Sequence, residues 1–367
     1  MKTKLKLILV LISLLFSLFF YSCSKEKWKG KIYQEQGVTV IESEGSGIWG
    51  DKINEKIEFK ENLSLGVEEG EEYLVFHSEL DVAVDSESNI YVLDIRNHRL
   101  LKFNKMGNFI WKAGRKGQGP GEFRNPSSVA VNSSKEIWIL DSSSLIHIFD
   151  NQGKFRRTMN LRAECSNFQF LPDGRLFINK PARGQMGFAA EFYSGEGNFL
   201  EIFASEYRFG RDLPRWAGGS LGGGGFQFLE GKIYMILPDR YEIREYDLEG
   251  KLLRKIKRDI QLKLPEIKEF QRGIQRGFIM RANNVMGPCF LYKGKMLLNM
   301  LMLIEDEAER EVEVKFYLDF FNEKGKFLGS YKLAEETELN NIDHEDNFYF
   351  VQQEPFPRVI RSILNIN

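Results

Sequence analysis

Hydrophobic and polar positions alternate with a period of two along most of this chain, a pattern that predicts strands rather than helices. A short apolar strand, a polar turn and an aromatic-rich strand recur six times, in segments that begin at Asp81, Ser127, Asn167, Gly225, Pro288 and Asn341. Each segment is typical of an antiparallel hairpin, because its two apolar runs are separated by only a few turn-forming residues.

A second kind of hairpin follows the first five of these segments. It is a seven-residue pattern. An aromatic residue and three variable residues are followed by glycine, then by Asn or Lys, and finally by Phe or Leu. The copies are FNKMGNF from Phe103, FDNQGKF from Phe149, YSGEGNF from Tyr193, YDLEGKL from Tyr246 and FNEKGKF from Phe321. Glycine supplies the positive φ angle that a tight turn needs. Two hairpins in each unit make four antiparallel strands.

Repeated units of four strands are the signature of propeller blades. We predict an all-β fold over residues 53–367, a six-bladed β-propeller of four-stranded antiparallel blades that begin near residues 81, 125, 165, 225, 288 and 340. The sixth unit lacks its second hairpin, since only one strand candidate, residues 358–366, precedes the end of the chain. An open edge would remain. The alternating segment 53–65 supplies the missing outer strand and closes the ring.

The N-terminal residues 1–22 have the pattern of a bacterial signal peptide. Lysines precede an apolar run, Leu7 to Tyr21, which is too short to span a bilayer. Ser22 and Cys23 then resemble the lipoprotein signal, in which a small residue precedes an acylated cysteine, although Phe20 replaces the usual Leu. We expect lipidation at Cys23, a membrane anchor, and a periplasmic or outer-membrane lipoprotein of the cell envelope. The alternative is an ordinary cleaved signal with an incidental cysteine.

Residues 23–52 are expected to form a polar tether and lead-in to the propeller. The composition agrees with a large β-rich core, since 43% of the residues are hydrophobic and the chain has 30 Phe and 13 Tyr. A formal net charge of −1 argues against a nucleic-acid partner. We expect a monomer, with Cys165 and Cys289 as buried thiols rather than a disulfide, because they fall at unequal positions of non-adjacent repeats.

One stretch carries a family resemblance. The segment GRKGQGPGEF, Gly114 to Phe123, followed by Pro126 and the strand Val129 to Val131, resembles the linker and first strand of NHL-type repeats. The run from Asp81 to Leu161 resembles the six-bladed propeller lipoproteins of some bacterial envelopes. The resemblance implies the fold. It leaves the function open, because NHL-like propellers include protein-binding sensors, RNA binders, a zinc lyase and lactonase relatives.

All long insertions fall between the second and third strands of a blade or between blades, which places them on one face of a propeller. They are residues 112–125, 181–190, 205–224, 258–287 and 304–311. Long loops on a rigid scaffold commonly bind ligands. Candidate binding residues for an anionic or glycan ligand are Arg96, Arg99, Arg115, Arg183, Arg211, Arg215, Trp216 and Arg240. The alternative is that the arginines are solvated and the aromatic residues pack on the propeller.

The insertion at residues 258–287 also contains a helix candidate that begins near Pro265. Apolar residues recur at spacings of three and four, with basic residues beside them. The proposed cap helix carries Ile267, Phe270, Arg272, Ile274 and Arg276. We expect it to lie across the long-loop face. The alternative is a gate over the channel mouth.

These observations favour a lipid-anchored extracytoplasmic module that binds an envelope protein or a glycan through the long-loop face. The alternative is a hydrolase or lyase at the central channel, whose nearest candidate residues are Asp81, Glu164 and Asn341. We assign no catalytic residue, cofactor or metal, because the four histidines occupy different repeat positions, at His77, His98, His147 and His344. Asp94 and Asp141 are expected to cap the loops that follow them.

Overall fold

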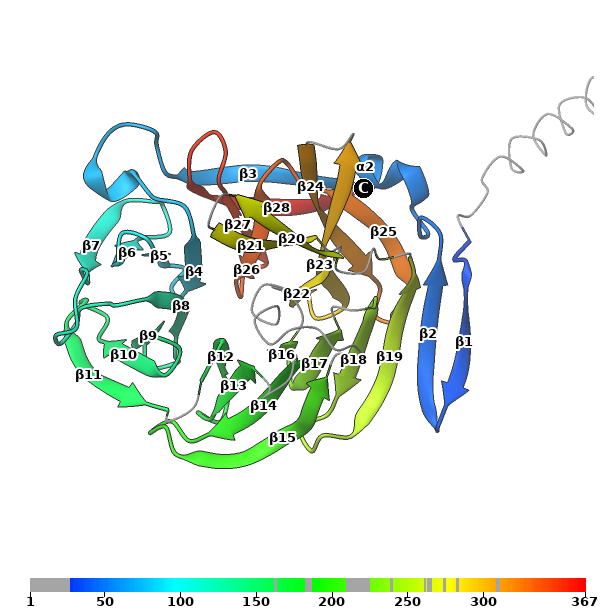
Figure 1. The fold of residues 1–367 in the computed structure, drawn as a ribbon, viewed down its shortest axis with the longest axis horizontal. Helices are drawn as coiled ribbons and strands as arrows, with labels where there is room; N and C mark the ends of the chain where they lie inside the picture. The colour runs from blue at the N-terminus through cyan, green and yellow to red at the C-terminus, as the bar shows by residue number, and fades with distance from the viewer. Residues whose placement is uncertain are drawn as a thin grey trace, which may run out of the picture.

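The computed structural model arranges six four-stranded antiparallel sheets as blades around a central axis (Figure 1). It describes residues 27–161, 164–181, 187–208, 225–237, 240–260, 262, 266–272, 275–281, 284–307 and 311–367. The prediction of an all-β, six-bladed propeller is therefore confirmed. Within each blade the first strand lines the central channel and later strands lie progressively closer to the rim.

The blades begin within a few residues of the boundaries expected from the sequence. Blade one consists of β4 (Leu80–Val84), β5 (Ile90–Asp94), β6 (Arg99–Phe103) and β7 (Phe109–Ala113). Blade two consists of β8 (Pro126–Val131), β9 (Ile137–Asp141), β10 (Leu145–Phe149) and β11 (Phe155–Asn160). Blade three consists of β12 (Asn167–Phe170), β13 (Leu176–Pro181), β14 (Gly187–Tyr193) and β15 (Phe199–Arg208). Blade four consists of β16 (Gly225–Leu229), β17 (Lys232–Leu237), β18 (Glu242–Tyr246) and β19 (Leu252–Asp259). Blade five consists of β22 (Asn284–Tyr292), β23 (Met296–Glu307), β24 (Glu311–Phe321) and β25 (Phe327–Lys332).

The sixth blade joins the two ends of the propeller. It consists of β26 (Thr337–Ile342), β27 (Asn347–Gln352), β28 (Arg358–Ile366) and, as outer strand, β3 (Ile57–Leu65). Strands β28 and β3 are antiparallel, with Val359 opposite Leu65 and Ile366 opposite Ile57. The predicted closure by an N-terminal strand is thus confirmed. Residues Ile53–Lys56 at the start of the expected strand instead form the short helix α2.

The segment expected to be a polar tether is largely folded. Strands β1 (Gly30–Glu35) and β2 (Val38–Glu44) form a hairpin, and β2 pairs in parallel with β19, the outer strand of blade four. Ser43 Oγ then accepts hydrogen bonds from Trp28 Nε1 at 2.9 Å and from the backbone N–H of Phe327 in blade five at 3.2 Å. Residues 30–44 of the expected tether and lead-in are thus part of the folded structure, because the alternating residues of β2 complete the edge of blade four.

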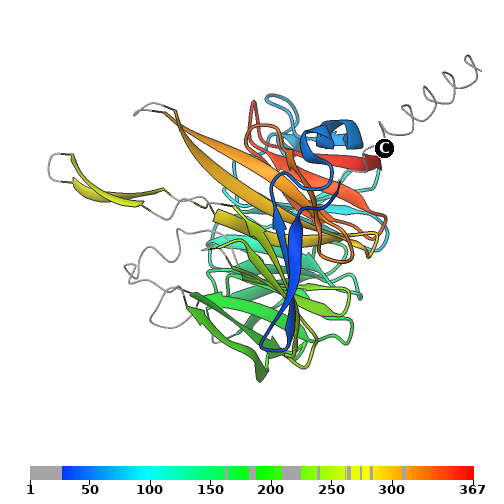
Figure 2. The same cartoon turned by 90° about the vertical axis from the view of Figure 1, so that its right-hand side faces the viewer.

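The expected cap helix is also absent from its predicted place. Residues Glu266–Arg272 (β20) and Gln275–Arg281 (β21) form a two-stranded antiparallel hairpin, with Ile267 opposite Met280 and Phe270 opposite Gly277. Ile274 lies outside the described residues. Gly273 and Gly277 fall inside the proposed helix, and each glycine in a helix interior costs about 1 kcal/mol relative to alanine. Figure 2 shows this hairpin, in yellow, projecting from the same side of the propeller as the long β23–β24 hairpin.

The repeated glycine hairpins join neighbouring blades. In each of three copies the residue that follows the aromatic residue accepts backbone hydrogen bonds through its side chain, and the next residue offers its carbonyl to a cation of the preceding blade. These contacts are Lys102 Nζ to the Asn151 carbonyl at 3.3 Å, Arg361 to the Lys105 carbonyl at 2.8 Å and Arg254 to the Glu323 carbonyl at 2.8 Å. The repeat is therefore a joint between blades as well as a turn.

The core consists of apolar clusters between adjacent blades. One cluster between blades five and six contains Ile57, Phe320 and Phe348, and another between blades four and five contains Ile243 and Phe321. Cys165 and Cys289 are buried free thiols, as expected from their positions in the repeats. No helix in the described part of the chain is long and apolar enough to cross a membrane.

Candidate functional site

The first strands of all six blades surround the central channel, which has a cavity of about 390 Å³. A first strand has one edge without a strand partner, so its backbone groups need other hydrogen-bond partners. Asn340 Oδ1 accepts from the N–H of Val82 at 2.9 Å, and Asn340 Nδ2 donates to Asp81 at 3.1 Å. Asp81 in turn accepts from the N–H of Val129 at 2.7 Å. These bonds connect blades six, one and two around the channel.

Hydrogen bonds from side chains to backbone groups also connect blades three and four. Gln169 accepts a hydrogen bond from the N–H of Phe228 at 2.7 Å, and Asn179 both accepts from the N–H of Phe226 and donates to its carbonyl. Burial raises the pKa of Asp81, against the hydrogen bonds that lower it. Asp81 and Asn341, considered for a channel reaction, therefore hold neighbouring blades together, since Asn341 Nδ2 donates to the Val82 carbonyl at 3.1 Å.

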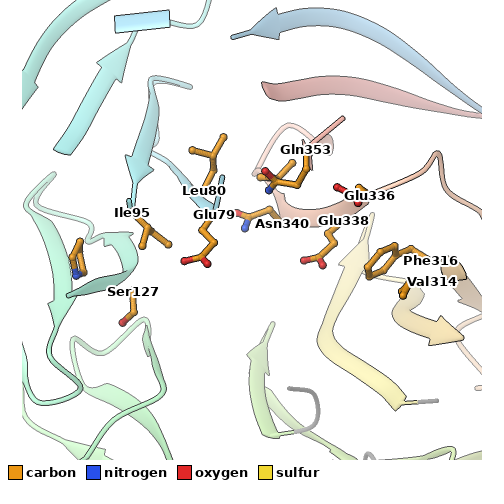
Figure 3. Close-up of a pocket in the computed structure, with 12 residues that line it drawn as sticks. Glu79, Leu80, Ile95, Ser127, Val314, Phe316, Glu336, Glu338, Asn340 and Gln353 are labelled. Carbon is orange, nitrogen blue, oxygen red and sulfur yellow. The ribbon is translucent and has the colours of Figure 1, made fainter. Parts of the chain in front are cut away.

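A larger cavity of about 630 Å³ adjoins the channel on the long-loop face, where Asn340 lines both. We call it the mouth cavity. Figure 3 shows the carboxylates of Glu79 and Glu338 directed into it, with Glu336 at its edge. The remaining lining residues are mostly apolar or neutral: Leu80, Ile95, Pro126, Ser127, Val314, Phe316, Val351 and Gln353. The mouth cavity is thus an apolar hollow with three carboxylates.

The three carboxylates differ in their surroundings. Glu79 forms an ion pair with Arg96. The side chain of Glu338 forms no hydrogen bond or ion pair to a described residue; the residue is exposed, yet desolvation by the surrounding protein raises the pKa of its carboxyl group. Glu336 is exposed and its backbone has a φ of 46°, in the left-handed region that is uncommon for residues other than glycine. Glu336 and Glu338 are therefore the carboxylates available to a ligand.

A second cavity of about 650 Å³ shares Glu79, Ile95, Pro126 and Ser127 with the mouth cavity. We call it the side cavity. Its other lining residues are mainly basic or polar: Arg96, His98, Lys116, Arg124, Asn125, Ser142 and Ser143. Both cavities are formed by links between blades and by loops between second and third strands. The two cavities adjoin at these shared residues, and we call them together the depression, which is acidic at one end and basic at the other.

Comparison with known proteins agrees with this architecture. The DUF5128 family, described as a 6-bladed beta-propeller, matches residues 77–194. NHL repeat-containing protein 3 of Homo sapiens is 27% identical over 157 residues, which are 39% of this chain and 45% of the human protein. The chain is a six-bladed β-propeller with NHL-like repeats. It spans less than half the length of the curated relatives it matches, including the mouse protein of the same name.

Two solved structures share the fold of this propeller over most of their length. A Bacteroides fragilis protein described as a candidate exported protein has a TM-score of 0.56 and 12% identity, covering 89% of this chain and 99% of its own. A DUF4221 family member from Bacteroides vulgatus has a TM-score of 0.54 and 10% identity, covering 85% and 99%. At these identities the likeness concerns the fold alone.

The propeller places the predicted binding arginines in different environments. Arg96 lines the side cavity. Arg99 is buried, bonds to Asp94 at 2.8 Å and donates to two backbone carbonyls, so its guanidinium group is fully used inside the protein. Arg115 is exposed and paired with Glu122, and Arg240 lies 3.7 Å from Glu242. Arg183, Arg211, Arg215 and Trp216 lie outside the described residues.

The backbone donors of the expected caps lie in the preceding link. Asp94 accepts from the N–H of His77, and Asp141 accepts from the N–H groups of Arg124 and Asn125. From the following loop the two carboxylates accept from side chains, those of Asn97 and Ser142. Desolvation raises the pKa of Asp141. Hydrogen bonds from His147 and from the two N–H groups outweigh it and lower the pKa to about 2. The described residues contain no group of three His, Cys, Asp or Glu side chains placed to hold a metal ion.

The prediction of arginines that bind an anionic or glycan ligand missed Glu79, Glu336 and Glu338. The missed glutamates lie close to the start of a first strand. Glu79 and Glu336 directly precede β4 and β26, and Glu338 is the second residue of β26. Side chains at that position reach the channel mouth because first strands are innermost. Position within the repeat was therefore the signal that could have found them.

Proposed function

We propose that this protein is a lipid-anchored extracytoplasmic module that binds an envelope protein or a glycan through its long-loop face. The observation that carries the proposal is the depression formed by the mouth and side cavities on that face. A rigid scaffold that presents a concave site lined by loops is the usual arrangement of a binding site. The polar side chains of the channel wall mostly connect blades, which favours binding at the mouth.

The anchoring part of the proposal rests on Cys23 and on the apolar segment before it. Strand β1 begins at Gly30, so six residues separate Cys23 from the folded propeller. Six residues span at most about 20 Å. Lipidation would therefore hold the rim of blade four close to the membrane surface. Metabolic labelling with an alkyne fatty acid should modify the native protein and not the Cys23→Ala variant; equal labelling of both would contradict lipidation at Cys23.

The binding part can be tested by photo-crosslinking in the native envelope. We compare the variant Glu79→Gln/Glu336→Gln/Glu338→Gln with the matched variant Glu196→Gln/Glu249→Gln/Glu323→Gln, whose exposed glutamates lie in the glycine hairpins on the opposite face. Crosslinks from the long-loop face should decrease only in the first variant. An equal decrease in both, or a decrease only in the second, would contradict binding through the long-loop face.

A further inference from the structure

The two adjoining cavities carry opposite charge. Arg96 and Glu79 lie at their boundary and neutralise each other as an ion pair. Glu336 and Glu338 remain at the acidic end, and Lys116 and Arg124 remain at the basic end. None of the side chains of these four residues forms an ion pair with a described residue. The depression is therefore an electrostatic dipole whose two ends are both available.

One residue that lines each cavity has a polar atom, enclosed by protein, that lacks a partner. Among the described residues, His98 Nδ1 and Gln353 Oε1, together with Glu35 Oε2 elsewhere, are buried without any hydrogen bond. His98 lines the side cavity and Gln353 lines the mouth cavity. Buried polar atoms without partners are rare, because each costs about 1–3 kcal/mol. A ligand in the depression would lie beside both residues.

The surface between the two ends includes apolar side chains beside Ser127 and the Glu79–Arg96 ion pair. Ile95 and Pro126 line both cavities, and Leu80, Val314 and Phe316 continue the apolar wall at the acidic end. A simple salt ion would leave this wall exposed to water. A ligand with an apolar stem between its charges would cover it, and burial of apolar area contributes about 25 cal/mol per Å².

We infer that the depression binds a zwitterionic ligand of the short-peptide type, with its amine at Glu336 and Glu338 and its carboxylate at Lys116 and Arg124. The stem lies across Ile95 and Pro126. This inference rests on the proposed function, since it uses the same binding face, and it adds a small zwitterionic ligand to the envelope protein or glycan. Charge complementarity at both ends also rejects ligands with only one of the two groups, because the opposite end then keeps its charges unpaired.

Calorimetric titration of the full-length protein with tri-, tetra- and penta-alanine tests the inference. Each peptide is used with free termini, with an acetylated amine and with an amidated carboxylate, and 8-aminooctanoate serves as a zwitterion without peptide groups. We expect one of the free peptides to bind best and either block to weaken it at least about threefold, the equivalent of about 0.65 kcal/mol. Binding of 8-aminooctanoate as tight as that of the best peptide would show that the charges and the stem suffice.

Two variants assign the ends. Glu336→Gln/Glu338→Gln should abolish the effect of acetylation and keep that of amidation, and Lys116→Gln/Arg124→Gln should do the reverse. Glu249→Gln/Glu323→Gln on the opposite face serves as the control. The inference is overturned if no free peptide binds, if blocked and free peptides bind equally, or if the two variants act on the same block. Crosslinking through the long-loop face would survive such a result, so failure of the ligand class is distinguishable from failure of the proposed function.

Discussion

Ile57 and Ile366 are paired opposite each other where the ring closes, yet the side chain of Ile57 is 2% exposed and that of Ile366 is 43% exposed. The two isoleucines belong to the same pair of strands and differ in burial. Directly opposed residues of antiparallel strands lie on the same face of the sheet, so the two isoleucines compare a buried and an exposed position at the same point of the seam.

Ile57→Ala should lower the free energy of unfolding by about 2–4 kcal/mol, because it leaves a cavity in the cluster between blades five and six. Ile366→Ala should lower it by less than about 1 kcal/mol. Urea unfolding followed by tryptophan fluorescence measures both. Equal losses would mean that β3 contributes through its backbone pairing and not through the packing of Ile57.

Asn340→Ala should destabilise the propeller by about 1–3 kcal/mol, because it leaves the N–H of Val82 and the buried Asp81 with one partner fewer. Asn341→Ala is the milder comparison, since Asn341 makes a single bond to the Val82 carbonyl. Thermal unfolding with calorimetry measures the two losses. A larger loss for Asn341→Ala would contradict the role given to the Asn340–Asp81 contact.

The Asp141 carboxylate should make stability depend on pH at the acidic end. Its pKa in the folded protein is about 2, against 3.8 for an ordinary aspartate, so folding favours the ionised form. Its contribution is complete above about pH 4 and is lost as the pH falls through 2. Asp141→Asn should therefore flatten the decline of unfolding free energy between these values, whereas Asp259→Asn, at an exposed position, should not. If unfolding free energy fell equally steeply with pH in the native protein, in Asp141→Asn and in Asp259→Asn, the role given to Asp141 would be refuted.

Gly153 and Gly174 both have positive φ angles, of 78° and 86°. A Cβ atom at Gly153 would lie 2.8 Å from the Trp111 ring of blade one, whereas a Cβ atom at Gly174 would have nothing within 4 Å. Gly174→Ala should cost about 1–2 kcal/mol for the backbone conformation alone, and Gly153→Ala about 1–3 kcal/mol more. Chemical unfolding of the two variants checks the difference, which should vanish if Trp111 moves aside.

Much of the fold could be predicted because the repeat imposes it. Alternation and the glycine hairpins give the number of blades, and the missing strand of the last blade predicts its partner in residues 53–65, of which Ile57–Leu65 form the strand. The cap helix was predicted from Ile267, Phe270 and Ile274, whose spacing also fits two short strands around a turn. Periodicity over so few residues does not distinguish a helix from a two-stranded hairpin. The glycines at 273 and 277, which disfavour a helix, were the evidence for the hairpin.

The candidate site was less predictable, because it depends on which side chains find partners within the protein. Arg96 and Arg99 are close in sequence, but Arg99 is buried against Asp94 while Arg96 lines a cavity. Glu336 ends a short link and Glu338 lies at the start of β26, in a segment with no distinctive motif. Only the ring geometry, which brings the end of one link beside the channel, places them with Glu79.

The pairing of β3 with β28 also constrains how the protein acquires its structure. Residues that meet at this seam are about 300 positions apart, and such remote pairings form late because a long loop must close first. During synthesis β3 is made before strands β4 to β27, and β28 is made after them. Until β28 has been made, β3 is a strand with an unsatisfied edge. The adjoining β1–β2 hairpin, which pairs with blade four, can hold it beside the growing ring in the meantime.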